Sequence, residues 1–239
     1  MLKSSVFKTK EKQYTLFATP LTCHKFGLSE FLAKNIETLG KLDHKKVLDV
    51  GCGVGPISIL FADQLDCYVT GVELNPIACE CCRLNIAKYN LFDKIELIER
   101  SFENFETSDK YDVIISNPPI DDSDYLPGEK TTRRDYRNMT PELFMFLTNS
   151  WRNDRGENLV DLMFSFSKLH LSDDGQLVIV YCSMSDSNMS KILKQANMAG
   201  LLLTKTLEGC IEPESIGVED LQKNTILATM LFFKKTNAL

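Results

Sequence analysis

The sequence predicts an α/β fold in which helices cover both faces of a mostly parallel sheet. Two observations lead to this prediction. From Lys46 onward, short apolar runs alternate with segments of helical periodicity, which is typical of successive β-α-β units. A glycine-rich segment also follows the first apolar run directly, at the place where such sheets bind ligands. We therefore expect one active site at this edge of the sheet.

The first half of the predicted sheet follows the alternation closely. We predict strands over 47–50, 67–72, 95–98 and 111–115, and helices over 57–65 and 76–89. Pro76 opens the second helix, because proline has the fixed φ of a first helical position. A short segment over 102–105 holds one helical turn.

The second half departs from the alternation at its end. We predict a helix over 159–169, a strand over 176–180 and a helix over 188–198. Residues 201–204 and 225–233 then form a closing antiparallel hairpin with a long loop. The stretch from Asp121 to Glu157 lacks periodicity, which usually marks a functional lid or a mobile segment.

The chain ahead of the sheet is shorter and less regular. Ser29 is of a residue type that caps helices and Gly40 of one that ends them, so one helix is expected through about Leu39. Residues 1–27 show no clear period. The predicted organisation is an N-terminal extension with one helix over residues 1–44 and a main domain over residues 45–239.

Composition and charge narrow the class of protein. The chain has 239 residues, 44% of them hydrophobic, and a formal net charge of −6, so bulk nucleic acid is not its default partner. Residues 1–12 lack the apolar run of a secretory signal, and no stretch is apolar enough to span a bilayer. The eight cysteines are then expected to be reduced thiols, and the location cytoplasmic.

The glycine-rich segment runs from Asp49 to Gly55 and alternates glycine with other residues. Glycine lets a backbone approach a ligand closely and adopt conformations that other residues avoid. Glu73 ends the next predicted strand, about 20 residues further on, where a carboxylate can bond both hydroxyls of a ribose. Loop and carboxylate together predict a site for a nucleoside-containing cofactor.

The spacing and charge of this segment favour one kind of cofactor. Gly51, Gly53 and Gly55 form Gly-x-Gly-x-Gly and not the Gly-x-Gly-x-x-Gly of dinucleotide sites. Asp49 places negative charge before the loop, which repels a pyrophosphate but attracts the cationic methionyl end of S-adenosylmethionine. A nicotinamide-dependent oxidoreductase is the rival interpretation, and both observations argue against it.

A second motif follows the fourth predicted strand. Asn117, Pro118 and Pro119 lie beside the same pocket, because the carboxyl ends of parallel strands meet at one edge of a sheet. The Asn117 side-chain oxygen can accept one hydrogen bond, and a carbonyl that precedes a rigid proline can accept a second. Two acceptors aimed at one NH2 group would orient an amide or an aromatic amine for methyl transfer.

These motifs resemble those of class I methyltransferases that modify planar nitrogen, specifically the HemK-type glutamine methyltransferases and their small-domain relatives that act on RNA bases. The resemblance runs from about Phe26 to the end and rests on Val-Leu-Asp-Val-Gly-Cys-Gly-Val-Gly, Gly-Val-Glu-Leu-Asn-Pro and Ile-Ser-Asn-Pro-Pro-Ile. It implies a Rossmann-like sheet of seven strands with an antiparallel last strand, and residues 45–239 as the methyltransferase domain. It also implies S-adenosyl-L-methionine as the cofactor.

The candidate site residues follow from the motifs and the resemblance together. For the cofactor they are Asp49, Gly51, Cys52, Gly53, Gly55, Glu73, Leu74, Ser101, Phe102 and Asn117, and for catalysis Asn117, Pro118, Pro119 and Ile120. Two of them depart from the family pattern. Ile120 stands where an aromatic residue usually stacks on the target, and Ser101 stands near the place of an acidic residue that bonds the adenine amine.

The acceptor is predicted less sharply than the cofactor. We expect a glutamine side-chain amide of a protein first, because the chain is acidic, and an RNA or DNA base amine second. The second is favoured by a basic cluster in the long loop, Lys130, Arg133, Arg134 and Arg137, with Tyr125 and Tyr136 nearby as stand-ins for the aromatic residue. A small molecule is the third alternative, and a degenerate fold that binds the cofactor without chemistry is the fourth.

Other reactive residues lack the pattern of a site. Cys79, Cys81 and Cys82 lie on one predicted helix without a second pair at zinc spacing, so no metal is expected. The three histidines lack a paired nucleophile, which argues against a hydrolase triad. The sequence leaves the oligomeric state open.

Overall fold

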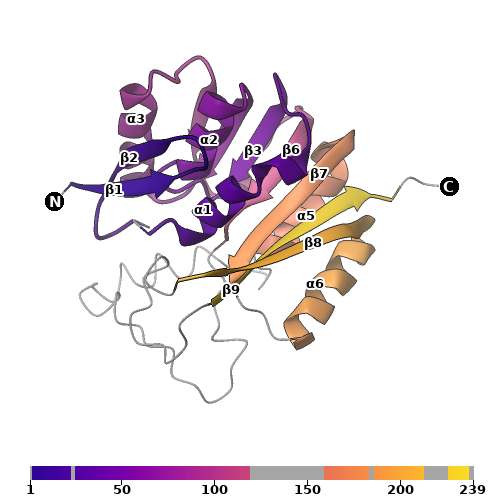
Figure 1. Ribbon diagram of the computed structural model, residues 1–239. Coiled ribbons are helices and arrows are strands. Elements are labelled where there is room, and N and C mark those ends of the chain that lie inside the picture. Colours follow the sequence, from indigo (N-terminus) through magenta and orange to yellow (C-terminus); the bar gives the residue numbers. More distant parts are fainter. Residues whose placement is uncertain (1, 23–24, 119–158, 183–185, 213–225, 237–239) are drawn as a thin grey trace, which may run out of the picture.

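The computed structural model describes residues 2–22, 25–118, 159–182, 186–212 and 226–236, and its centre is a seven-stranded sheet (Figure 1). The strand order across the sheet is β5-β4-β3-β6-β7-β9-β8. The strands are β3 (Lys46–Val50), β4 (Tyr68–Glu73), β5 (Ile95–Glu99), β6 (Tyr111–Ser116), β7 (Leu171–Cys182), β8 (Leu201–Ile211) and β9 (Ile226–Lys235). The order reverses beside β3, so the loop after β3 lies at a switch point of the sheet.

One strand of the sheet runs against the others. β3, β4, β5, β6 and β7 pair in parallel, β9 pairs antiparallel with both β7 and β8, and β8 therefore runs with the parallel set. The predicted α/β class, the seven strands and the antiparallel last strand are thus confirmed. The closing hairpin is also confirmed, although β8 and β9 are longer than their apolar cores because the pairing continues through polar residues.

Helices cover the sheet on both faces, as Figure 1 shows. α1 (Gly27–Lys34), α2 (Pro56–Gln64) and α3 (Pro76–Lys88) pack into one hydrophobic cluster, and α5 (Leu159–His170) and α6 (Asp186–Met198) into the other. Val47 faces the first cluster and Leu48 the second, as alternation along a strand requires. Both faces of β3 are therefore buried.

The predicted N-terminal helix is shorter than expected. It begins with Phe26 as N-cap and not at Ser29, which is buried inside the first turn, because the Glu30 amide already bonds to the Phe26 carbonyl. It ends at Asn35, whose side chain donates to the Phe31 carbonyl (2.8 Å). A 3-10 turn, η1 (Ile36–Leu39), completes the predicted span.

Residues 1–27 carried no predicted element, and the structure shows a two-stranded antiparallel hairpin there. β1 (Lys3–Lys8) pairs with β2 (Gln13–Ala18), and the hairpin lies on the α2 and α3 side of the sheet (Figure 1). Phe7, Tyr14 and Leu16 are fully buried in the same cluster as α2 and α3. The boundary at residue 44 stays a prediction.

None of the helices in the described part of the chain is both long enough and apolar enough to cross a membrane.

Candidate active site

The carboxyl ends of β3, β4, β5 and β6 lie side by side at one edge of the sheet. Val50 pairs with Val72, and Glu73 pairs with Glu99, so the ends of β3, β4 and β5 are level. Asp49 pairs with Ile115 on the other side of β3. The loops that carry the predicted motifs are therefore neighbours in space.

The glycine loop after β3 has a backbone that only glycine adopts readily. Gly51, Gly53 and Gly55 have φ of 70°, 58° and 91°. The Gly51 amide bonds to the Val72 carbonyl (2.8 Å), which fastens the loop to the end of β4. A Cβ added at Gly51 or Gly53 would meet no atom within 4 Å, so both residues face open space.

Gly55 and Cys52 instead face the protein interior. A Cβ at Gly55 would lie 2.8 Å from the Cys82 sulfur, so only glycine allows α3 to pack this closely. The Cys52 thiol hydrogen-bonds with Cys82 and lies against Gly71, and these contacts with burial raise its pKa well above the ordinary value. Cys52 can therefore offer a ligand only its backbone.

Asp49 lies beneath the glycine loop, fully enclosed by protein. Its carboxyl accepts a hydrogen bond from the Ser58 hydroxyl (2.6 Å) and another from the Ser58 amide in the first turn of α2. Gly55, the N-cap of α2, has no side chain for this purpose, so Asp49 supplies the missing acceptor. Burial raises the pKa of Asp49 to about 7.

Glu73 stands at the end of β4 with both carboxyl oxygens engaged. Oε2 accepts from the Gly53 amide and Oε1 from the Asn75 amide, both at 2.8 Å. Burial raises its pKa, and the amides of Asn75, Gly53 and Leu74 oppose that rise. Each oxygen keeps a second lone pair, so the carboxylate can still bond a pair of hydroxyls.

Ser101 and Phe102 follow β5 at the next position along the edge. Ser101 is the N-cap of the 3-10 turn η2 (Phe102–Asn104), which confirms the predicted turn. The Phe102 ring packs against Phe105 and Phe166, with centroids 6.3 and 5.1 Å away. Phe102 is 8% exposed, so it forms the floor of this end of the site.

The acceptor motif begins where β6 ends. Ser116 is buried, and its hydroxyl donates to the Val50 carbonyl (2.7 Å), which ties the end of β6 to the start of the glycine loop. Asn117 is half-buried, and its side chain forms no hydrogen bond within the described part of the chain; Pro118 is buried. Pro119 and Ile120 lie outside the described residues.

The sequence analysis missed two residues that shape the site. Ser58 holds the Asp49 carboxyl, and no motif marks it, because the contact exists only once α2 packs on β3. Asn75 caps α3 by accepting from the Ile77 amide (3.0 Å), while its own amide donates to Glu73. An asparagine directly before Pro76 is a helix-start signal and could have identified it.

The other reactive residues considered in the sequence lie either in the hydrophobic core or outside the described residues. Cys79, Cys81 and Cys82 are buried free thiols on α3, and the described residues contain no group of His, Cys, Asp or Glu that could hold a metal ion. The basic cluster of residues 130–137 and both Tyr125 and Tyr136 lie outside the described residues.

The sheet order, the switch-point glycine loop and the acidic residue after β4 define the class I S-adenosylmethionine-dependent methyltransferases. Residues 27–131 match the family model of the methyltransferase small domain, as the resemblance indicated. The open faces of Gly51 and Gly53 and the remaining acceptor capacity of the Glu73 carboxylate fit the cofactor of this class, S-adenosyl-L-methionine.

Two kinds of relative align with the chain. A tRNA1(Val) (adenine(37)-N6)-methyltransferase of Aliivibrio fischeri is 35% identical over 92 residues, which cover 37% of this chain and 39% of the relative. A release factor glutamine methyltransferase of Fusobacterium nucleatum is 29% identical over 179 residues, which cover 73% of this chain and 47% of the relative. The matches thus span less than half the length of these relatives.

Solved structures share the fold at low sequence identity. A methyltransferase from Pyrococcus furiosus has a TM-score of 0.57 and 14% identity, with 90% of this chain and 86% of that chain covered. TYW2 of M. jannaschii in complex with AdoMet has a TM-score of 0.53 and 15% identity, with 97% and 86% covered. These likenesses show the fold alone.

Proposed function

We propose that this chain is an active N-methyltransferase that uses S-adenosyl-L-methionine and orients a planar nitrogen with Asn117. The observation that carries the proposal is the position of Asn117. It follows β6 beside the glycine loop, fixed by the bond from Ser116 to Val50, and its side chain is free of hydrogen bonds within the described part of the chain. A buried neighbourhood with a free amide oxygen suits a bound NH2 group.

The cofactor would be held by backbone and carboxylate together. The open faces of Gly51 and Gly53 would lie against it, and Glu73 would accept hydrogen bonds from the ribose hydroxyls. Asp49 would act through the start of α2, since its carboxyl is turned to Ser58. Ser101 and the backbone of Leu74 would border the adenine side.

The acceptor would need orientation more than a strong base. Asn117 Oδ1 and the Pro118 carbonyl would accept the two N–H bonds, which directs the nitrogen lone pair at the methyl carbon. When bound, the cofactor supplies an electrophilic methyl group on sulfur. Asn117 Oδ1 and the Pro118 carbonyl would keep the nitrogen in line with that methyl group during transfer, and one N–H proton would leave to water afterwards.

A protein glutamine amide is the preferred acceptor. The net charge of −6 disfavours a polyanion, and the release factor glutamine methyltransferase aligns over 73% of the chain. An RNA base amine is the second candidate, because the adenine-N6 relative has the higher identity, 35%, over its shorter alignment. For an RNA acceptor we also propose contact with the basic segment of residues 130–137. The cytoplasmic location stays a prediction.

Calorimetric titration with the cofactor tests the proposed cofactor. Transfer of a labelled methyl group into protein, RNA and small-molecule pools then tests the proposed acceptor. We expect a micromolar Kd for S-adenosylmethionine and no binding of NADH. We also expect the label in protein, in a form that acid hydrolysis releases as methylamine from the glutamine side chain. Label in RNA would select the second acceptor. Cofactor binding without transfer to protein, RNA or small-molecule pools would contradict the proposed activity, and binding of NADH alone would contradict the class.

A further inference from the structure

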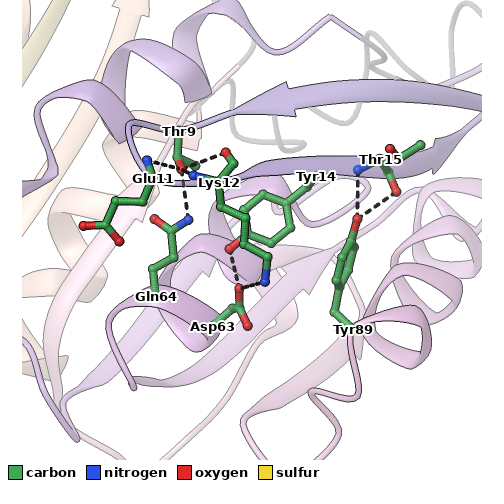
Figure 2. A network of polar contacts seen from close by, with 8 residues as sticks. All are labelled: Thr9, Glu11, Lys12, Tyr14, Thr15, Asp63, Gln64 and Tyr89. Atoms are coloured by element: carbon green, nitrogen blue, oxygen red, sulfur yellow. Dashed lines mark hydrogen bonds and ion pairs between the residues drawn. The ribbon is translucent and has the colours of Figure 1, made fainter.

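The N-terminal hairpin is fastened to the two helices that follow the cofactor motifs. On the α2 side, Tyr14 and Lys12 both donate to Asp63, Lys12 at 2.6 Å, and Gln64 donates to the Thr9 hydroxyl at 2.9 Å (Figure 2). α2 is the helix that begins directly after the glycine loop. The hairpin thus bonds to the C-terminus of α2, whose N-terminus follows the glycine loop.

A second set of bonds joins the hairpin to α3. The Thr15 amide donates to the Tyr89 hydroxyl (2.8 Å), which lies against the Thr15 carbonyl as well (3.1 Å; Figure 2). Tyr89 is the C-cap of α3, the helix that follows Glu73. These bonds lie at the opposite end of α3 from Glu73 and make no contact with the glycine loop.

Asn85 of α3 is the one described side chain that hydrogen-bonds to both the hairpin and the glycine loop. Its Oδ1 accepts from the Phe17 amide (2.6 Å), and its Nδ2 donates to the Phe17 carbonyl (3.0 Å) and to the Val54 carbonyl (2.9 Å). The side chain is completely buried. A buried amide that uses its acceptor and both donors is fixed in one orientation.

Val54 stands between Gly53 and Gly55, where the backbone has the greatest freedom. A loop with three glycines loses more conformational entropy on ordering than other loops, and that loss weakens ligand binding unless another contact has already ordered the loop. Within the described residues, the Val54 carbonyl receives its hydrogen bond from Asn85 alone. The Gly51 and Gly53 amides hold the loop to the end of β4, and the bond from Asn85 to the Val54 carbonyl holds it from the side of α3 and the hairpin.

From these contacts we infer that Asn85 is a positioning residue for cofactor binding, and that the N-terminal hairpin orders the glycine loop through it. The inference rests on the proposed function, because it assigns Asn85 to the site where that function places the cofactor. Hairpin strand β2 orients the amide, the amide orients Val54, and Val54 fixes the glycines on either side of it.

The test compares Asn85→Ala with Tyr89→Phe. Both remove bonds between α3 and the hairpin, but only Asn85→Ala removes the bond to the loop. We expect Asn85→Ala to raise the cofactor Kd about tenfold or more, and Tyr89→Phe to leave it within about twofold. An unchanged Kd in Asn85→Ala, or an equal rise in Tyr89→Phe, would overturn the inference.

Hydrogen exchange without cofactor separates this inference from the proposed function. The Gly55 amide bonds to the Cys52 carbonyl inside the loop (2.9 Å), so its exchange reports loop order directly. We expect faster exchange at Gly55 in Asn85→Ala than in Tyr89→Phe, and equal rates would contradict the inference. Failure of the parent protein to bind cofactor would instead contradict the proposed function.

If Asn85→Ala does not fold, Asn85→Leu takes its place. Leucine fills the same buried volume without a charge and has no N–H for the Val54 carbonyl. We expect the same rise in Kd and the same faster exchange at Gly55, and their absence would count against the inference in the same way.

Discussion

The ends of β3 and β4 differ from the end of β6 in how fully their polar groups are paired. Asp49 is bonded to Ser58, and Glu73 to the amides of Gly53 and Asn75. Asn117, one strand away, has no hydrogen bond to its side chain within the described part of the chain. The carboxylates at the ends of β3 and β4 are therefore already hydrogen-bonded, whereas the Asn117 amide can still form hydrogen bonds.

This difference suggests a division of work between neighbouring strands. Groups that are paired before a ligand arrives set the shape of a site and hence the affinity for the ligand it fits. A group without partners can instead form its bonds only with the reacting molecule, where they affect the rate. We therefore expect changes at β4 to alter cofactor affinity and changes at β6 to alter turnover.

The largest expected effect is at β6. Asn117→Ala removes the amide oxygen that would orient the acceptor, and we expect kcat to fall about 100- to 1,000-fold. Because the proposed cofactor contacts of Gly51, Gly53 and Glu73 remain, the cofactor Kd should change less than about threefold, and a larger change would favour the predicted contact of Asn117 with the cofactor. Single-turnover methyl transfer and calorimetry on the same sample check this. If the cofactor Kd rose strongly together with the fall in kcat, β6 would not differ from β4 in the way proposed.

Glu73→Gln is the matching change at β4. Both carboxyl oxygens accept backbone N–H bonds, and an amide would turn an NH2 group toward one of these donors. We expect cofactor affinity to fall about 10- to 100-fold. Glu99→Gln is the control, since Glu99 pairs with Glu73 in register and, among the described residues, its carboxyl bonds Arg83 alone. Equal losses in both variants would contradict a specific role for Glu73.

Asp49 adds a dependence on pH. Its pKa is about 7 in the folded protein, above the ordinary value, so between about pH 4 and 7 the folded state binds more protons than the unfolded state. Its contribution to the free energy of unfolding therefore falls as pH rises, by about 1.4 kcal/mol per pH unit for one proton. Asp49→Asn cannot titrate and should lack this slope. Urea midpoints at pH 5 and pH 7 measure the difference, and parallel slopes would refute it.

The smallest expected effect tests how closely the glycine loop packs against α3. Gly55→Ala places a Cβ 2.8 Å from the Cys82 sulfur, whereas Gly200→Ala, also at positive φ, meets only the Thr236 hydroxyl at 3.5 Å. We expect Gly55→Ala to cost about 1 kcal/mol more of the free energy of unfolding. Adding Cys82→Ala should recover most of that excess in urea unfolding. No recovery would mean that backbone conformation, and not the contact, causes the loss.

The sequence predicted the sheet because its strands are apolar and regularly spaced. Runs such as Val113–Ile115 are buried on both faces, and this makes them recognisable without knowledge of their neighbours. β2 was missed because only Tyr14, Leu16 and Ala18 face the core, between polar or half-buried residues. Such a short alternation, without a clear turn motif, resembles a loop.

The site was predicted as far as its backbone motifs reach. Glycine was expected at Gly51 and Gly53 because it adopts conformations that other residues avoid, and both have positive φ; Glu73 was expected to end its strand, and β4 ends there. The orientation of side chains did not, because it depends on packing between elements far apart in sequence. Cys52 stays a predicted cofactor residue through its backbone, but its thiol lies beside Cys82, and no local pattern indicates that contact.

The family-model match and the hydrophobic core of this protein begin at different residues. The methyltransferase small domain match starts at residue 27, but Phe7, Tyr14 and Leu16 belong to the same hydrophobic cluster as α2 and α3. A chain shortened to residue 27 would leave the buried Asn85 amide without Phe17 and would open that cluster to water. Domain boundaries drawn from similarity alone would therefore remove part of the core that supports the glycine loop.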